Sequence, residues 1–238
     1  MLKYISVICL LSLLIYFTQT NFADSQTIFN PNSYTGDHDN VLIILDASYS
    51  MEDSLNGQRK IDIAKRAINQ VLSELSPNVW VGLRVYGHKS GFLGYKSCRA
   101  SELKVSIGAD NQSLISQELA KIEPVGWTPI SYSIQQAVNN DFRGLSGKKR
   151  IILVSDGMET CDGSPCDYVV GLIKNGIDLK IDTIGFNLSD KMAVSQLKCT
   201  ALATRGKFYT ANNAQELADS LAKTLNTSKE VQGKIITK

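Results

Sequence analysis

Three oxygen-bearing side chains follow an apolar run in the segment Val41 to Met51, VLIILDASYSM. The run of Val, Leu and Ile is typical of a strand buried on both faces, as found in parallel sheets. Asp46, Ser48 and Ser50 come directly after it. In open α/β sheets, ligands bind outside the carboxyl ends of the strands. These side chains are therefore candidate ligands of a hard cation such as Mg²⁺, Mn²⁺ or Ca²⁺.

Asp and Ser after a strand also commonly form a turn or cap a helix, so this motif alone does not establish a site. Two later segments supply further oxygen atoms. Thr128 lies in the segment GWTPI, residues 126–130, where it is a candidate N-cap with Pro129 in the first turn of a helix. Asp156 follows RIILVS, residues 150–155, another continuous apolar strand that ends in an acid.

Strands and helices alternate along the chain, which is typical of an α/β domain. Apolar runs and alternation predict strands over 41–45, 79–86, 101–107, 150–155, 179–184 and 208–209. Helical spacing predicts helices over 58–75, 110–122, 165–174, 192–204 and 213–225, and one beginning near residue 130. In the helix over 58–75, Lys60, Lys65 and Arg66 are expected to face water.

A chain of 238 residues with 43% apolar and 20% charged residues has the composition of an ordinary globular protein. Because no composition break interrupts the alternation, we expect one doubly wound α/β domain over 38–226. Residues 24–37 are polar with Pro and Gly and are predicted to be a linker. Residues 227–238 are predicted to be a flexible tail.

The N-terminus has the layout of a secretory signal peptide over residues 1–23, with Lys3 ahead of an apolar stretch over 4–17. Asn21 stands where a small residue is preferred for a cut after Ala23, so an uncleaved N-terminal anchor is the alternative. The whole chain has 25 basic and 23 acidic residues, and residues 1–23 contain one of the basic residues, Lys3, and no acid. The rest of the chain therefore has 24 basic and 23 acidic residues. A net charge near +1 gives no reason to expect a nucleic acid partner.

Of the five cysteines, Cys9 lies in the signal segment, and Cys98, Cys161, Cys166 and Cys199 remain. An even count in an exported chain favours two disulfides. A zinc site is the alternative, but the spacing of the two nearest cysteines is wide for a zinc knuckle.

Together, the three oxygen-bearing segments resemble the von Willebrand factor type A domain with a metal-ion-dependent adhesion site. The family pattern is Asp-x-Ser-x-Ser after the first strand, a Thr ahead of a helix and an Asp after the fourth strand, and it matches here in order and spacing. The segments DGMETC, GSPC and QLKC also resemble secreted bacterial members. The resemblance implies a mostly parallel six-stranded sheet in the order 3-2-1-4-5-6, with the third strand antiparallel and helices on both sides.

The resemblance also implies a site for one divalent cation, Mg²⁺ first and Mn²⁺ or Ca²⁺ as alternatives. Its implied ligands are Asp46, Ser48, Ser50, Thr128 and Asp156. An open coordination position would accept an Asp or Glu carboxylate of a partner protein, with Thr128 nearest to it. Tyr49 stands where the family often has Gly, and its phenol either contacts the partner or packs inward. The expected function is that of an exported adhesion or assembly module, secreted or extracytoplasmic, which meets a membrane only through its N-terminal segment.

The same topology suggests a pairing of the cysteines. Loops after the second and fourth strands both leave the carboxyl edge of the sheet, so we expect Cys98 to join Cys161 near the metal face. Cys166 and Cys199 are then expected to join neighbouring helices. Joining Cys161 to Cys166 instead would close only a short loop and constrain the unfolded chain less.

An enzyme is the competing hypothesis. A phosphatase of the haloacid dehalogenase type also uses an Asp after a buried strand, which would be Asp46, but it needs a second acid two residues on, where Ser48 stands. A serine hydrolase needs a histidine base, and the chain contains only His38 and His88. With no glycine-rich phosphate loop either, we expect a binding module and not an enzyme.

Overall fold

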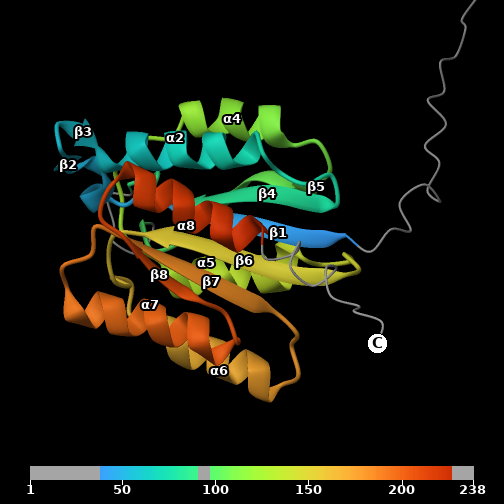
Figure 1. Ribbon diagram of the computed structural model, residues 1–238. Helices are drawn as coiled ribbons and strands as arrows, with labels where there is room; N and C mark the ends of the chain where they lie inside the picture. Colours follow the sequence, from blue (N-terminus) through green and yellow to red (C-terminus); the bar gives the residue numbers. More distant parts are fainter. Residues whose placement is uncertain (1–37, 91–96, 227–238) are drawn as a thin grey trace, which may run out of the picture. The chain divides into compact units, whose positions relative to one another are not determined.

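The computed structural model describes residues 38–90 and 97–226 (Figure 1). The expected signal peptide or anchor over 1–23, the linker over 24–37 and the tail over 227–238 lie outside the described residues. Within the described part of the chain, no helix is long and apolar enough to cross a membrane.

A six-stranded sheet in the order β5-β4-β1-β6-β7-β8 forms the centre of the domain (Figure 1). Its strands are β1 (Asp39–Asp46), β4 (Val79–Tyr86), β5 (Ser101–Gly108), β6 (Lys148–Ser155), β7 (Lys180–Phe186) and β8 (Phe208–Ala211). Among these described strands, β5 pairs antiparallel with β4 and all other neighbours are parallel. The expected order 3-2-1-4-5-6, with an antiparallel third strand at the edge, is confirmed.

Helices cover both faces of this sheet (Figure 1). They are α2 (Lys60–Leu72), α4 (Gln112–Ala120), α5 (Ile130–Gln136), α6 (Pro165–Lys174), α7 (Lys191–Ala203) and α8 (Ala214–Asn226), with a 3₁₀ turn η1 (Tyr49–Glu52) and a π-helical segment η2 (Ala137–Asp141). One buried cluster joins the sheet to α2, α4 and α8, and another joins it to α5, α6 and α7. Alternate residues of β1 enter the two clusters, as a strand buried on both faces requires.

A short hairpin, β2 (Ser54–Leu55) with β3 (Gln58–Arg59), precedes α2 and was not expected. Its turn residues Asn56 and Gly57 both have positive φ, 54° and 80°, the combination that a type I′ hairpin turn requires. Because the hairpin occupies Gln58 and Arg59, the helix predicted over 58–75 begins at Lys60. It ends at Leu72.

The predicted orientation of two lysines in α2 was wrong. Lys60 and Lys65 are 7% and 9% exposed, whereas Arg66 faces water as expected. Lys65 Nζ donates to the carbonyl oxygen of Ile122, and Lys60 Nζ reaches the carboxyl end of β6. A lysine can lie on the margin of an apolar helix face because its long aliphatic stem carries the ammonium group to a distant partner.

Two disulfides link loops and helices at the periphery of the sheet. Cys98 joins Cys161, which connects the segment before β5 to the loop after β6, with 5.4 Å between their Cα atoms. Cys166 joins Cys199, which connects α6 to α7, with 5.5 Å between Cα atoms. These are the two pairs expected from the sequence.

Candidate metal centre

The first strand ends in a buried carboxylate. Asp46 is 0% exposed, and each of its carboxylate oxygens accepts one hydrogen bond. The Ser48 backbone N–H donates to Oδ1 at 2.7 Å, and the Ser155 hydroxyl donates to Oδ2 at 2.6 Å. Asp46 therefore fixes the turn after β1 and ties it to the last residue of β6.

The two serines of the motif lie beside the second acid. The hydroxyl oxygens of Ser48 and Ser50 are 3.2 Å apart, and the Ser50 hydroxyl donates to Oδ1 of Asp156 at 2.6 Å. Asp156 follows directly after β6, which lies next to β1 in the sheet. The two acids and two serines predicted from the sequence thus lie together at the carboxyl edge of the sheet.

Thr128 reaches this edge through a close backbone contact. Gly126 forms a parallel bridge with Ser48, and its carbonyl oxygen accepts from the Tyr49 N–H at 2.9 Å. A Cβ atom on Gly126 would lie 2.5 Å from the carbonyl oxygen of Lys89, so a side chain here requires the backbone to move. Glycine at this position lets the segment before α5 pack against the motif.

The predicted role of Thr128 as a helix cap was wrong. Helix α5 begins at Ile130 after Pro129, and no side chain caps its first turn. Thr128 instead forms two hydrogen bonds with Thr160, whose hydroxyl accepts from the Thr128 N–H at 2.9 Å and whose N–H donates to the Thr128 carbonyl at 3.2 Å. The Thr128 side chain, 5% exposed, lines the same cleft as the two serines.

This cleft has a volume of 340 Å³ and opens to the surface between the motif and the segment before α5. It is lined by Ser48, Tyr49, Ser50, Gly126, Trp127, Thr128 and Thr160. Tyr49 is 72% exposed and Trp127 is 48% exposed, so two aromatic side chains stand at the rim. Of the two alternatives for Tyr49, inward packing is excluded by this exposure.

Burial and neighbouring charges shift the pKa values of two groups in the centre. Burial, followed by the charge of Asp156, raises the pKa of Asp46 to about 6, against the hydrogen bonds from Ser155 and Ser48. Lys60 Nζ donates to Oδ2 of Asp156 at 2.8 Å and lies 3.5 Å from Oδ2 of Asp53. Burial would lower the pKa of Lys60, but the hydrogen bond and charge of Asp156, with Asp53, outweigh it and raise that pKa.

The donor set fits a hard divalent cation. Its atoms are carboxylate and hydroxyl oxygens, the ligands that Mg²⁺ and related ions prefer. Adjacent ligands of an octahedral ion with bonds of about 2.1 Å are about 3 Å apart. The separations of 3.2 Å from Ser48 to Ser50 and 2.6 Å from Ser50 to Asp156 are close to that spacing. Asp46, Ser48, Ser50, Thr128 and Asp156 are the residues that could hold the ion.

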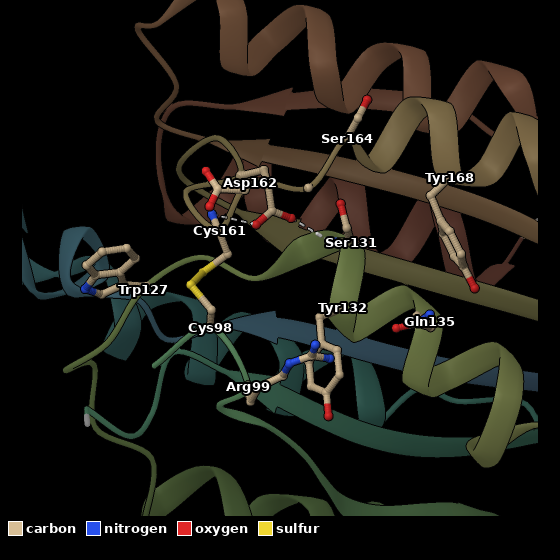
Figure 2. A pocket seen from close by; sticks show the side chains of 12 residues that line it. Cys98, Arg99, Trp127, Ser131, Tyr132, Gln135, Cys161, Asp162, Ser164 and Tyr168 are labelled. Carbon is tan, nitrogen blue, oxygen red and sulfur yellow. Dashed lines mark hydrogen bonds between the residues drawn. A yellow bond between two sulfur atoms is a disulfide. The ribbon is translucent and has the colours of Figure 1, made fainter. Parts of the chain in front are cut away.

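A larger pocket of 630 Å³ adjoins the cleft and shares Trp127 with it (Figure 2). The Cys98–Cys161 disulfide lies along its wall, and the Arg99 guanidinium stacks over the Tyr132 ring at 4.6 Å. Glu159 fixes the far wall, because its carboxylate accepts from the backbone N–H groups of Ser131 at 2.7 Å and Cys161 at 2.9 Å. Burial raises the pKa of Glu159 despite these bonds.

Three residues of the centre were missed by the sequence analysis. Ser155 was assigned only to a strand, and Lys60 was assigned to the solvent face of a helix. Thr160 was noted only within the segment DGMETC, to which no role in the site was given. The Asn56-Gly57 pair indicated a hairpin turn before α2 and could have corrected the start of that helix. No comparable sequence feature marks Ser155 or Thr160.

Two proteins of Bacillus subtilis are similar to this chain over most of its length. The chain is 32% identical over 189 residues to the uncharacterized protein YwmD of Bacillus subtilis (strain 168), covering 77% of this chain and 84% of YwmD. It is 28% identical over 221 residues to the uncharacterized protein YwmC of the same organism, covering 91% of this chain and 94% of YwmC.

Solved structures of low sequence identity share the fold. A von Willebrand factor type A protein from Catenulispora acidiphila has a TM-score of 0.63 at 17% identity, covering 80% of this chain and 43% of that one. The vWF domain of the type V pili tip protein Mfa5 from Porphyromonas gingivalis has a TM-score of 0.59 at 16% identity, covering 84% and 98%. Proximal thread matrix protein 1 from the mussel byssus, solved with a zinc-occupied MIDAS motif, has a TM-score of 0.59 at 18% identity, covering 79% and 46%.

The family model described as von Willebrand factor type A domain matches residues 40–223, which include all five candidate ligands and every strand of the sheet but the first residue of β1. This chain therefore belongs to the von Willebrand factor type A domain family.

Proposed function

We propose that this protein is an exported binding module that uses a divalent cation to capture a carboxylate of a partner protein. The observation that carries the proposal is that Ser48, Ser50 and Thr128 line one open cleft. The two acids lie directly behind it, because Asp46 accepts from the Ser48 N–H and Asp156 accepts from the Ser50 hydroxyl. The proposed ligands are Asp46, Ser48, Ser50, Thr128 and Asp156.

Charge and ligand type determine what the centre would bind. Two carboxylates balance a divalent cation, and hydroxyl ligands add no charge, so the ion stays electrophilic. Mg²⁺ is our first choice, with Mn²⁺ or Ca²⁺ as alternatives, because each prefers oxygen ligands. The mussel byssus protein carries zinc in its MIDAS motif, so Zn²⁺ belongs among the ions to be tested. When bound, the ion supplies a Lewis-acidic position that accepts an oxygen atom from outside the chain.

The partner is proposed to be a protein that presents an Asp or Glu side chain. The rim of the cleft supports a protein ligand, since Tyr49 and Trp127 are exposed aromatic residues of the kind enriched in protein interfaces. Thr128 lines the cleft beside the serines. By resemblance to the family, it is proposed as the ligand nearest to the entering partner. Fold relatives include a pilus tip protein, which is consistent with an adhesion or assembly role.

A phosphatase-like hydrolase that uses Asp46 as nucleophile is the competing function. Asp46 is fully buried, and both of its oxygens accept hydrogen bonds within the protein, so it is poorly placed to attack a substrate. In a serine hydrolase the candidate base would be His88, which pairs with Glu102 at 2.9 Å on the antiparallel edge of the sheet. The site therefore supports binding better than catalysis.

Export is proposed from two independent features. The first 23 residues have the layout of a signal peptide or anchor. Two disulfides in one domain are typical of oxidising compartments and rare in the cytosol. The proposed location is secreted or extracytoplasmic, with membrane attachment only if residues 1–23 are retained.

Partner capture under metal control tests this function. The mature chain, immobilised and exposed to the native envelope and extracellular fractions, should retain a partner with Mg²⁺ and release it with EDTA. Thr128→Ala should weaken capture more than it weakens metal binding, because its hydroxyl is one neutral ligand among several. Thr210→Ala is the matched control, since Thr210 is an exposed threonine on β8 that lines neither pocket. Capture that is indifferent to EDTA would refute the proposal.

A further inference from the structure

Lys60 is a buried cation that contacts the proposed metal centre. Its side chain is 9% exposed, and Nζ donates to Oδ2 of Asp156 at 2.8 Å. The backbone holds it there, because the Lys60 N–H donates to the Asp53 carbonyl at 2.9 Å across the β2–β3 hairpin. The hairpin therefore fixes the backbone of Lys60, and Asp156 and Asp53 hold its ammonium group.

The two oxygens of Asp156 have different partners. Oδ2 pairs with Lys60, whereas Oδ1 accepts the Ser50 hydroxyl, which lines the open cleft. Lys60 thus leaves one oxygen of this carboxylate for the metal side and withholds the other. A bidentate contact from Asp156 would place the ion against the oxygen that already accepts from the Lys60 ammonium.

Lys60 also changes the charge of the centre. Asp46 and Asp156 together carry two negative charges, and the ammonium of Lys60 returns one positive charge, which leaves a net charge of −1. Asp53 also lies near Nζ, but its side chain is 65% exposed and its charge is screened by water. With a divalent cation bound, the two carboxylates and Lys60 together would give the buried centre a net charge of +1. Without Lys60, the net charge would be zero.

We propose that Lys60 tunes the centre toward anionic partners, weakening the hold on the metal ion while strengthening its attraction for an incoming carboxylate. Lys60 acts through Asp156 as a positioning and specificity-determining residue, and in this proposal it touches neither the metal ion nor the partner. This inference rests on the proposed function. It adds that Lys60 lowers the affinity for the metal ion and raises the affinity of the bound ion for a carboxylate. If Lys60 served stability alone, its replacement would change neither the affinity for the metal ion nor the affinity for the carboxylate.

Replacing the ammonium by a neutral group of similar length tests the proposal. Lys60→Met should tighten Mn²⁺ binding, measured by isothermal titration calorimetry, by about tenfold, since a like charge within a few ångström costs on the order of 1.4 kcal/mol or more. Acetate serves as the carboxylate probe, detected by its displacement of Mn²⁺-bound water in proton relaxation measurements. Lys60→Met should need at least about threefold more acetate than the wild type for half-saturation.

Lys65→Met is the matched control, because Lys65 is equally buried on the same helix but donates to the carbonyl oxygen of Ile122. It should lower stability and leave both affinities unchanged. Lys60→Arg keeps the charge and should behave like the wild type, and Lys60→Gln replaces Lys60→Met if the latter does not fold.

The outcomes separate this inference from the proposed function. If the wild type binds Mn²⁺ and Lys60→Met binds it with the same affinity, the role of Lys60 is overturned and the proposed function stands. The same holds if Lys65→Met gains as much Mn²⁺ affinity as Lys60→Met. Absence of binding of Mn²⁺, Mg²⁺, Ca²⁺ and Zn²⁺ by the wild type overturns the proposed function and the inference with it.

Discussion

Asp46→Ala gives the most direct quantitative test of the metal centre. A ligand that binds only the folded state at one hundred times its dissociation constant stabilises that state by about 2.7 kcal/mol. In a domain of this size each kcal/mol raises the unfolding temperature by about 2–4 °C. The wild type should therefore unfold about 5–11 °C higher at that concentration of Mg²⁺ or Mn²⁺.

The loss in the variant follows from the charge that is removed. A unit charge about 4 Å from a divalent cation contributes about 2 kcal/mol even at the dielectric constant of water. Its removal weakens metal binding roughly thirtyfold, so the same metal concentration is only about three times the new dissociation constant. The residual stabilisation is then about 0.8 kcal/mol, a shift of about 2–3 °C.

Differential scanning fluorimetry with and without metal measures this response. Asp46→Ala also removes the acceptors of Ser48 and Ser155, so the metal-free variant itself should be less stable. For that reason the shift on metal addition, and not the absolute unfolding temperature, is the relevant quantity. Asp182→Ala is the matched control, since Asp182 is a buried strand aspartate, 1% exposed, that accepts from the Lys207 N–H. A full metal shift in Asp46→Ala, or none in the wild type, would refute the reasoning.

Three other predictions concern the partner surface, pH and the disulfide. Trp127→Ala should weaken partner capture at least about tenfold and leave the metal-induced shift unchanged, because exposed interface tryptophans contribute strongly to binding and Trp127 only borders the metal cleft. The hydrogen bond from Lys89, with those from Lys104 and His88, holds the pKa of Glu102 below its ordinary value of 4.5. Glu102 therefore adds stability that is present above that value and lost as the pH falls, so urea unfolding should show Glu102→Gln less stable by under about 1 kcal/mol at pH 7 and no less stable in strong acid. The double variant Cys98→Ser, Cys161→Ser should lose about 4 kcal/mol of unfolding free energy in urea, given the 63 residues that the bond spans, and retention of full stability would contradict that role.

The sheet could be predicted well because its strands are continuous apolar runs with few alternative interpretations. Residues of β1 and β6 are apolar on both faces, which favours central parallel strands, whereas β5 alternates and lies at the edge. The order of the strands came from the resemblance and not from periodicity. The positions of the two acids followed from this order, since both follow strands that proved to be neighbours.

Local features of the site were harder to predict because tertiary contacts outweigh local preferences there. Thr128 has the sequence context of a helix cap, yet its backbone pairs with Thr160, 32 residues away. Lys60 has the helical position of a solvent-facing residue, yet an acid 96 residues away holds its ammonium group. Helical periodicity describes where a Cα–Cβ bond points and says little about the end of a long side chain.

Two glycines explain why three distant segments can form one centre. Gly87 ends β4 with φ of 74°, and a Cβ atom there would lie 2.5 Å from the Ser48 nitrogen. Gly126 is packed equally closely on the other side, against the carbonyl oxygens of Lys89 and Gly87. The Val125 N–H donates to the Gly87 carbonyl at 3.1 Å, so the loop after β4 packs against both the motif and the segment that carries Thr128. Backbone contact without side chains therefore sets the distance between the serines and the threonine, and the hydroxyl groups need no long side chain to reach the same cleft.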